Sequence, residues 1–218
     1  MKKVLVAWVF VSSLVHTAYC SLPPFLSQGF WCPGQVVLEN QQVVFGEINY
    51  DLKYNAIQVR DNGVVRTYTA EKIAHFKMFD QVKHRERHYV TIDHQLEEGY
   101  QRKTFFEVLT EGDVTILRKS KYVRKPRVTE DQRAPHIYLN AVCRHEYYAY
   151  NQGEFFQIED FEEQILPRMA SYEDLVQGYI KRCKLKLRKI NEQMRVVHLY
   201  NQLCSQQANE GAVTEVLE

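Results

Sequence analysis

The sequence predicts an α+β fold: a mostly antiparallel β-sheet or partial barrel with a long C-terminal helix packed on it. Between residues 35 and 160, short apolar runs alternate with turn residues, as in β-hairpins. From residue 171 to residue 204, apolar residues recur every three or four positions, which is the spacing of one helix face. The 218 residues are enough for one such domain over 21–204, followed by a flexible tail at 205–218.

Three predicted hairpins each turn at a glycine. The first turns at Asn62-Gly63, a pair that supplies the positive φ angles of a two-residue turn. The other two turn around Gly112 and Gly153. The predicted strand pairs are 56–60 with 64–68, 104–109 with 114–118, and 141–150 with 154–159. Further strands are expected at 43–50 and 88–93, so the β-rich part, 35–160, is predicted to be a meander.

A basic segment interrupts this pattern at residues 119–135. It contains Pro126 and Pro135, and proline has no backbone N–H to donate to a β-ladder. The segment is therefore predicted to be a linker or a long exposed loop.

The helical part is predicted to span residues 161–204. Ser171 is expected to cap its long helix, with Asp174 completing the capping pattern. The apolar stripe from Tyr172 to Cys204 needs a cover. A face of the sheet in the same chain is the favoured cover. A partner helix in a coiled coil is the alternative, because the stripe residues are spaced by about 3.5 positions on average.

The N-terminus has the three parts of an export signal. Met1-Lys2-Lys3 is cationic, Val4–Val15 is almost entirely apolar, and Ala18 and Cys20 are small residues at the −3 and −1 positions of a cut after Cys20. Residues 1–20 are therefore predicted to be a signal peptide. The chain is expected to be periplasmic, associated with the outer membrane, or secreted. Lipidation of Cys20 is the alternative to simple cleavage.

The charge balance of the mature chain gives no general preference for a polyanionic partner. Without Lys2 and Lys3, 26 basic residues stand against 27 acidic residues, which gives a formal net charge of −1. Such a balance gives no general reason to expect nucleic acid as a partner. The apolar run of the leader is too short to span a membrane, and no later segment approaches the ~20 apolar residues that a spanning helix needs.

Four cysteines remain after the predicted cut: Cys32, Cys143, Cys183 and Cys204. On one straight helix, the last two would lie ~31 Å apart, beyond disulfide reach. Two bridges would then have to pair both of them with Cys32 and Cys143. The alternative is four buried free thiols, since free cysteine packs like a small apolar residue.

Short motifs are distributed over most of the mature chain. They are Gly46–Asp51, Phe105–Leu109 with Gly112 and Leu117, Tyr179–Lys181 with Leu185–Leu187, and Tyr200-Asn201. In these motifs the chain resembles a group of uncharacterised exported proteins common in Bacteroidota. The resemblance implies export from a bacterial cell and a β-then-helix layout, and it assigns no activity and no site residues.

Two groups of residues are weak candidates for chemistry. Cys143 and His145 are two positions apart on a predicted strand, so both side chains point to one face, where a thiol and an imidazole could act together. His84, His88 and His94 form the densest group of potential metal ligands. Arginines between His84 and His88 oppose a cation, and no cofactor is expected.

The sequence favours a non-enzymatic exported protein that binds a protein or a glycan. Its expected contact surface combines the aromatic third hairpin with the basic segment: Tyr147, Tyr148, Tyr150, Phe155, Phe156, Arg124, Lys125 and Arg127. The alternative is an envelope hydrolase based on the Cys143 thiol or on the carboxylates near Glu159. The hydrolase requires a concave pocket in which at least two of these groups converge.

Overall fold

A computed structural model describes residues 31–95, 99, 101–128 and 137–215. For Gln95, 124–128, 137–142 and 208–215 it describes the backbone but not the side chains. The predicted signal peptide at 1–20, including Cys20, lies outside the described residues.

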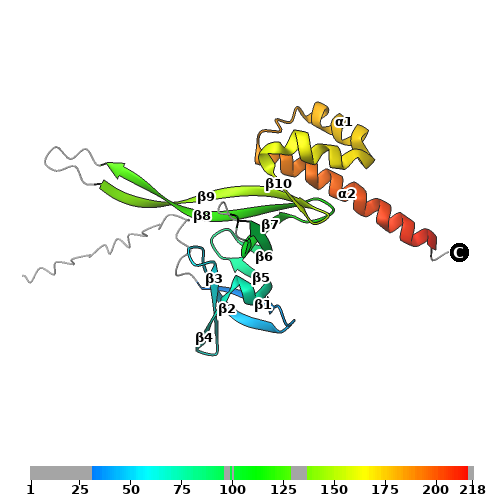
Figure 1. The fold of residues 1–218 in the computed structure, drawn as a ribbon. Coiled ribbons are helices and arrows are strands. Elements are labelled where there is room, and N and C mark those ends of the chain that lie inside the picture. Colours follow the sequence, from blue (N-terminus) through cyan, green and yellow to red (C-terminus); the bar gives the residue numbers. More distant parts are fainter. Residues whose placement is uncertain (1–30, 96–98, 100, 129–136, 216–218) are drawn as a thin grey trace, which may run out of the picture.

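Ten strands of the described chain form one antiparallel sheet, in the order β10-β9-β8-β7-β6-β5-β1-β2-β3-β4 (Figure 1). Two meanders, β1–β4 and β5–β10, are joined where β1 pairs with β5. The strands are β1 Cys32–Leu38, β2 Val43–Asp51, β3 Ala56–Asp61, β4 Val64–Thr69, β5 Ile73–Asp80, β6 Arg85–Gln95, β7 Gln101–Thr110, β8 Thr115–Val128, β9 Ile137–Asn151 and β10 Glu154–Gln157. The predicted α+β class is confirmed in this broad sense.

The three predicted hairpins are present. Asn62 and Gly63 have φ angles of 47° and 78°, as the turn between β3 and β4 requires. Gln152 and Gly153 form the turn between β9 and β10 in the same way, with φ angles of 50° and 90°. Strands β1 and β5 were not predicted as individual strands, although residues 35–38 and 73–80 lie in the part predicted to be β-rich.

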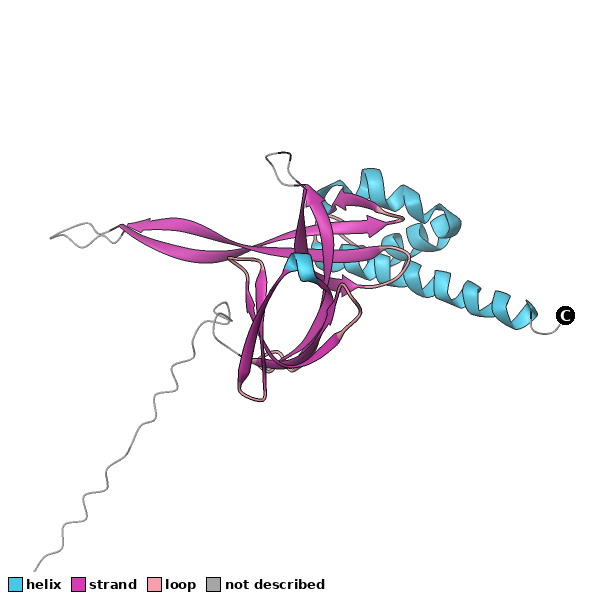
Figure 2. Cartoon of the chain, turned by 60° about the horizontal axis from the view of Figure 1, so that its bottom comes forward, coloured by secondary structure: helices cyan, strands magenta, loops and turns pink. Residues whose placement is uncertain are grey.

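The linker predicted at 119–135 is wrong for its first ten residues. Strand β8 continues to Val128 and pairs with β9 as far as the Val128–Ile137 pair. Strand β7 pairs with β8 only at residues 116–118. Residues 119–128, the outer part of β8, therefore pair only with β9 among the described strands (Figures 1 and 2). Edge strands tolerate proline, which explains how Pro126 fits within β8. Residues 129–135 lie outside the described chain.

The single long helix predicted over 171–204 is also wrong. Three short helical turns, η2 Ile158–Asp160, η3 Phe161–Ile165 and η4 Leu166–Tyr172, lead into α1 Glu173–Cys183 and α2 Ile190–Glu215. Helix α1 ends at Cys183, and the next residue, Lys184, has a left-handed backbone with φ 51°. The Tyr172 hydroxyl at the start of α1 donates to the Leu203 carbonyl (3.1 Å), so the two helices fold back on each other. The ~31 Å estimate for Cys183 and Cys204 assumed one straight helix and no longer applies. All four cysteines are free thiols.

Two apolar clusters fill one side of the sheet. One includes Ile48, Ile57, Phe76 and Phe105. There the Phe105 amide donates to the Asn55 side chain (3.2 Å), which links the turn after β2 to β7. The other cluster joins the opposite end of the sheet to the helices and includes Ile116, Ala149, Phe156, Phe161, Val196 and Val197. Among the described residues, no helix is long and apolar enough to cross a membrane.

Candidate functional site

A row of directly paired residues crosses five strands between the two apolar clusters. The pairs are Phe76–Tyr89, Tyr89–Glu107, Glu107–Arg118 and Arg118–Tyr147. Paired residues of an antiparallel sheet point to the same face. The middle of this inner face is therefore charged, whereas its two ends belong to the apolar clusters.

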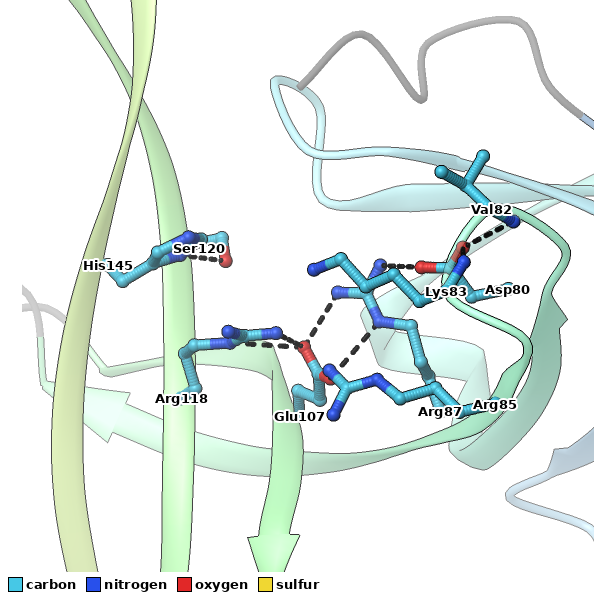
Figure 3. A network of polar contacts seen from close by, with 9 residues as sticks. All are labelled: Asp80, Val82, Lys83, Arg85, Arg87, Glu107, Arg118, Ser120 and His145. Carbon is cyan, nitrogen blue, oxygen red and sulfur yellow. Dashed lines mark hydrogen bonds and ion pairs between the residues drawn. The ribbon is translucent and has the colours of Figure 1, made fainter. Parts of the chain in front are cut away.

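Glu107 is the centre of the charged part of this face (Figure 3). Its side chain is 3% exposed. Arg87 donates to both carboxylate oxygens, from Nε to Oε1 at 3.1 Å and from Nη2 to Oε2 at 2.7 Å. Arg118 donates to Oε2 from Nε at 3.2 Å and also from Nη2, and Arg85 reaches Oε1 at 3.3 Å. Three guanidinium groups thus converge on one buried carboxylate.

These contacts keep Glu107 ionised. Burial alone would raise the pKa of Glu107, but the hydrogen bonds and positive charges of Arg87 and Arg118 outweigh it and lower the pKa below its ordinary value. Leaving one of these charges unpaired in a buried site would be costly, which explains why the arginines surround the carboxylate so closely.

Asp80 extends the network to the turn between β5 and β6. Its Oδ2 lies 3.6 Å from Arg87 Nη1, and its Oδ1 accepts the backbone N–H groups of Val82 (3.1 Å) and Lys83 (3.0 Å). Asp80 therefore fixes the backbone from which the Lys83 side chain projects across Arg87 (Figure 3). We call the set Asp80, Lys83, Arg85, Arg87, Glu107 and Arg118 the charged band; it carries four positive and two negative charges.

The strand register brings the candidate pair Cys143 and His145 beside this band. Both residues point to the same face of the sheet. Cys143 is paired with Tyr122 of β8, and His145 is paired with Ser120. His145 Nδ1 lies 2.8 Å from Ser120 Oγ (Figure 3). Burial lowers the pKa of His145 and raises the pKa of Cys143, so the imidazole and the thiol are both neutral at pH 7. A neutral thiol is a poor nucleophile, so this environment does not favour thiol chemistry.

The three candidate metal ligands are not brought together. His84 is exposed in the turn before β6, His88 lies beside the His75 ring, and His94 contacts Phe106 and Tyr148. His88 and His94 are six residues apart in one strand, a separation of roughly 20 Å. Within the described residues, no group of three or more His, Cys, Asp or Glu side chains is arranged to hold a metal ion.

The predicted aromatic surface is divided between the two faces of the sheet. Tyr148, Tyr150 and Phe155 are half-buried on the outer face, where Phe155 lies 5.1 Å from Tyr150 and 5.6 Å from the buried ring of Phe106. Phe156 is on the inner face, only 8% exposed, with the Arg168 guanidinium 4.1 Å above its ring. Phe156 is therefore a core residue and takes no part in an exposed surface.

The predicted basic residues Arg124, Lys125 and Arg127 belong to the outer part of β8, where the backbone but not the side chains is described. We call residues 119–128 and 137–146 the β8–β9 arm. It carries six lysines and arginines and one glutamate. Its strands pair with each other and project from the sheet (Figures 1 and 2).

The carboxylates near Glu159 line a groove of about 560 Å³ between the end of β9, η2–η3 and the start of α2. Its rim carries Glu159, Asp160, Glu162 and Glu163, and its apolar lining includes Ile158, Leu187 and Ile190. Tyr147, the last residue of the paired row that begins at Phe76, also lines this groove. A carboxylate-based hydrolase needs at least two of these carboxylates in one pocket, and four acidic residues line this groove.

Sequence reasoning missed the charged band, although one signal was available. Glu107 stands within the apolar run from Phe105 to Leu109, and a charge in such a strand needs a buried partner. The partners themselves lie on β6 and β8, and only the register reveals them. Comparisons with known protein families, with curated proteins and with solved structures found no match.

Proposed function

We propose that this is an exported, non-enzymatic binding protein of the bacterial cell envelope, and that its partner is an anionic glycan bound along the β8–β9 arm. The observation that carries the proposal is the net charge of the arm, +5, on a mature chain whose formal net charge is −1. The remainder of the chain is therefore acidic, and it does not attract a polyanion.

The shape of the arm suits a linear ligand. Ten residues of β8, 119–128, extend over roughly 30 Å at the usual rise per strand residue. Five of the ten are lysine or arginine. A row of cations along an extended ribbon can follow the repeating charges of an acidic polysaccharide, whose binding would release counterions. Lys121 is held by Glu146 on the neighbouring strand, which leaves the basic character concentrated toward the tip.

The rest of the fold acts in this proposal as a rigid base. The sheet serves as a partial barrel, and the C-terminal helices cover its end at the second apolar cluster. A base with packed cores holds a projecting ribbon in place, so that ordering the arm costs little when the ligand binds.

Binding to dextran sulfate tests the proposal, with neutral dextran as the uncharged control. We expect the mature protein to bind dextran sulfate and not dextran at physiological salt. The variant R124Q/K125Q/R127Q should bind at least tenfold more weakly, because three lost ion pairs of roughly 0.5–1 kcal/mol each amount to about 1.5–3 kcal/mol, and about 1.4 kcal/mol is tenfold. Polyglutamate of similar length, titrated in parallel, reports whether an acidic polypeptide is preferred.

A matched variant separates the position of the charges from their number. K181Q/R182Q/K186Q removes three charges from exposed residues at the end of α1 and just after it. This control should bind dextran sulfate like the wild type. Equal losses in both variants, or a preference for polyglutamate, would refute the assignment of an anionic glycan to the arm.

The carboxylate groove supports a hydrolase as the second candidate. Four acidic residues line one groove, and glycosidases use a pair of carboxyl groups that flank the bond to be cleaved. A general acid, however, needs a desolvated carboxyl group, and Glu159, Glu162 and Glu163 are exposed. Turnover of nitrophenyl glycosides that is abolished by Glu159→Gln would establish this second function in place of the first.

A further inference from the structure

We propose a second ligand site, on the inner face of the sheet: an oxyanion site formed by Lys83, Arg118 and the Ser120–His145 pair. Ser120 and His145 lie at the base of the arm, but the site uses none of the arm's lysines and arginines, so it does not depend on the proposed glycan binding. Its ligand is a carboxylate, phosphate or sulfate group of a small molecule.

The charged band has more positive charge than its own carboxylates balance. Arg87 is committed to the two carboxylates of the band, because Nε and Nη2 bind Glu107 and Nη1 faces Asp80. Lys83 has no ion pair or side-chain hydrogen bond within the part of the chain that the structure describes. The surplus of two positive charges is thus available to an anion that enters from the Lys83 side.

Arg118 presents an unused donor next to this surplus. Its Nε and Nη2 both donate to Glu107, and among the described contacts its Nη1 has no partner. The side chain is 12% exposed, so it is held in place and yet reaches solvent. Glu107 fixes the guanidinium plane, and a second oxyanion can bind its open edge.

The Ser120–His145 pair adds one donor in either tautomer. If Nδ1 accepts from Ser120, then Nε2 carries the hydrogen and donates to a ligand. If Nδ1 donates to Ser120 Oγ, the serine hydroxyl is the donor, and a ligand then competes for it with the Cys143 sulfur, its other partner. The charges of Arg118, Lys83 and Arg87 all act on His145 and help to lower its pKa, after the larger effect of burial. Arg118 and Ser120 are two positions apart on β8, so they point to one face, and Figure 3 shows the Lys83 side chain reaching toward the Ser120–His145 pair. These groups can therefore share one ligand.

Calorimetric titration of the mature protein with inorganic phosphate, sulfate and acetate tests the site. We expect at least one of the three anions to bind, and the one bound most tightly identifies the oxyanion class. Phosphate or sulfate binding should shift the ring signals of His145 in NMR spectra and leave those of exposed His198 unchanged. Lys83→Gln should weaken binding about tenfold, the size of one lost charge-assisted contact.

Lys83→Gln is a safe variant, because its side chain is exposed and only its backbone N–H is bound by Asp80. Lys189→Gln, at another exposed lysine, is the matched control and should bind like the wild type. Absence of binding by all three anions up to about 10 mM, or equal affinity in Lys83→Gln, would overturn the site. The arm variant R124Q/K125Q/R127Q should keep oxyanion binding, so failure of one proposal is distinguishable from failure of the other.

Discussion

Glu107 shows how a single charge can organise a sheet face. It lies at a core position of β7, where an apolar residue would cost less, and it is compensated by arginines on β6 and β8. Buried pairs of this kind contribute little net stability compared with apolar packing, but they make both partners hard to remove.

The network therefore predicts a large effect of Glu107→Gln. The amide keeps the shape and loses the charge, which leaves Arg87 and Arg118 without their shared counter-ion. We expect the free energy of unfolding to fall by about 3–5 kcal/mol, measured by urea denaturation. Glu111→Gln, at an exposed position, is the control and should change it by less than about 0.5 kcal/mol. A loss below about 1 kcal/mol at Glu107 would mean that the band is not a coupled network.

Stability should also decrease as the pH falls. Burial lowers the pKa of His88, His94 and His145 below the ordinary 6.5, and the arginines lower that of Glu107 below 4.5. Lowered pKa values mean that the unfolded chain binds protons first, so protonation favours unfolding. The free energy of unfolding should drop below about pH 6.5 and again below about pH 4.5. A flat or rising profile from pH 7 to pH 5 would contradict the burial of these imidazoles.

At the scale of elements, Asn201 attaches α2 to the turn between β7 and β8. Its Oδ1 accepts the Val114 N–H at 3.0 Å, and its Nδ2 donates to the carbonyls of Val114 (2.7 Å) and Glu111 (3.2 Å). Gly112 makes room for it, because a Cβ there would lie 2.4 Å from the Asn201 side chain. The sequence contains both residues, but nothing local reveals that residues about 90 positions apart meet.

Asn201→Ala should detach this contact. It leaves two buried backbone groups of Val114 without partners, and we expect a loss of roughly 2–3 kcal/mol in the free energy of unfolding. Hydrogen exchange at the Val114 amide should accelerate by more than the loss in the free energy of global unfolding explains. Gln202→Ala, at the exposed neighbouring position, is the control and should be nearly neutral. Unchanged exchange at Val114 in the Asn201 variant would argue against the contact.

The elements also show where local sequence reasoning fails. Alternation and turn residues located the hairpins because both signals are local. The helix break at Lys184 has no glycine or proline to mark it, and the apolar stripe continues across it because both helices contact one cluster. Strand β8 was missed beyond Arg118 because prolines and lysines are ordinary on an edge strand.

At the scale of the molecule, positive and negative charges are concentrated in different regions. The arm is basic, the groove near Glu159 is acidic, and the inner face holds a partly neutralised band between two apolar clusters. Of the candidate sites, the sequence placed Cys143 and His145 on one face but did not identify Ser120 as the partner of His145. That pairing depends on the register between β8 and β9, which arises from tertiary contacts.

The salt dependence of dextran sulfate binding tests the central claim most directly. If the arm binds a polyanion by counterion release, the logarithm of the association constant falls linearly with the logarithm of salt concentration, in proportion to the charges engaged. For R124Q/K125Q/R127Q we expect a slope shallower by about 2, at roughly 0.7 for each lost contact, and for K181Q/R182Q/K186Q we expect the wild-type slope. Identical slopes for the wild type and the arm variant would contradict the account.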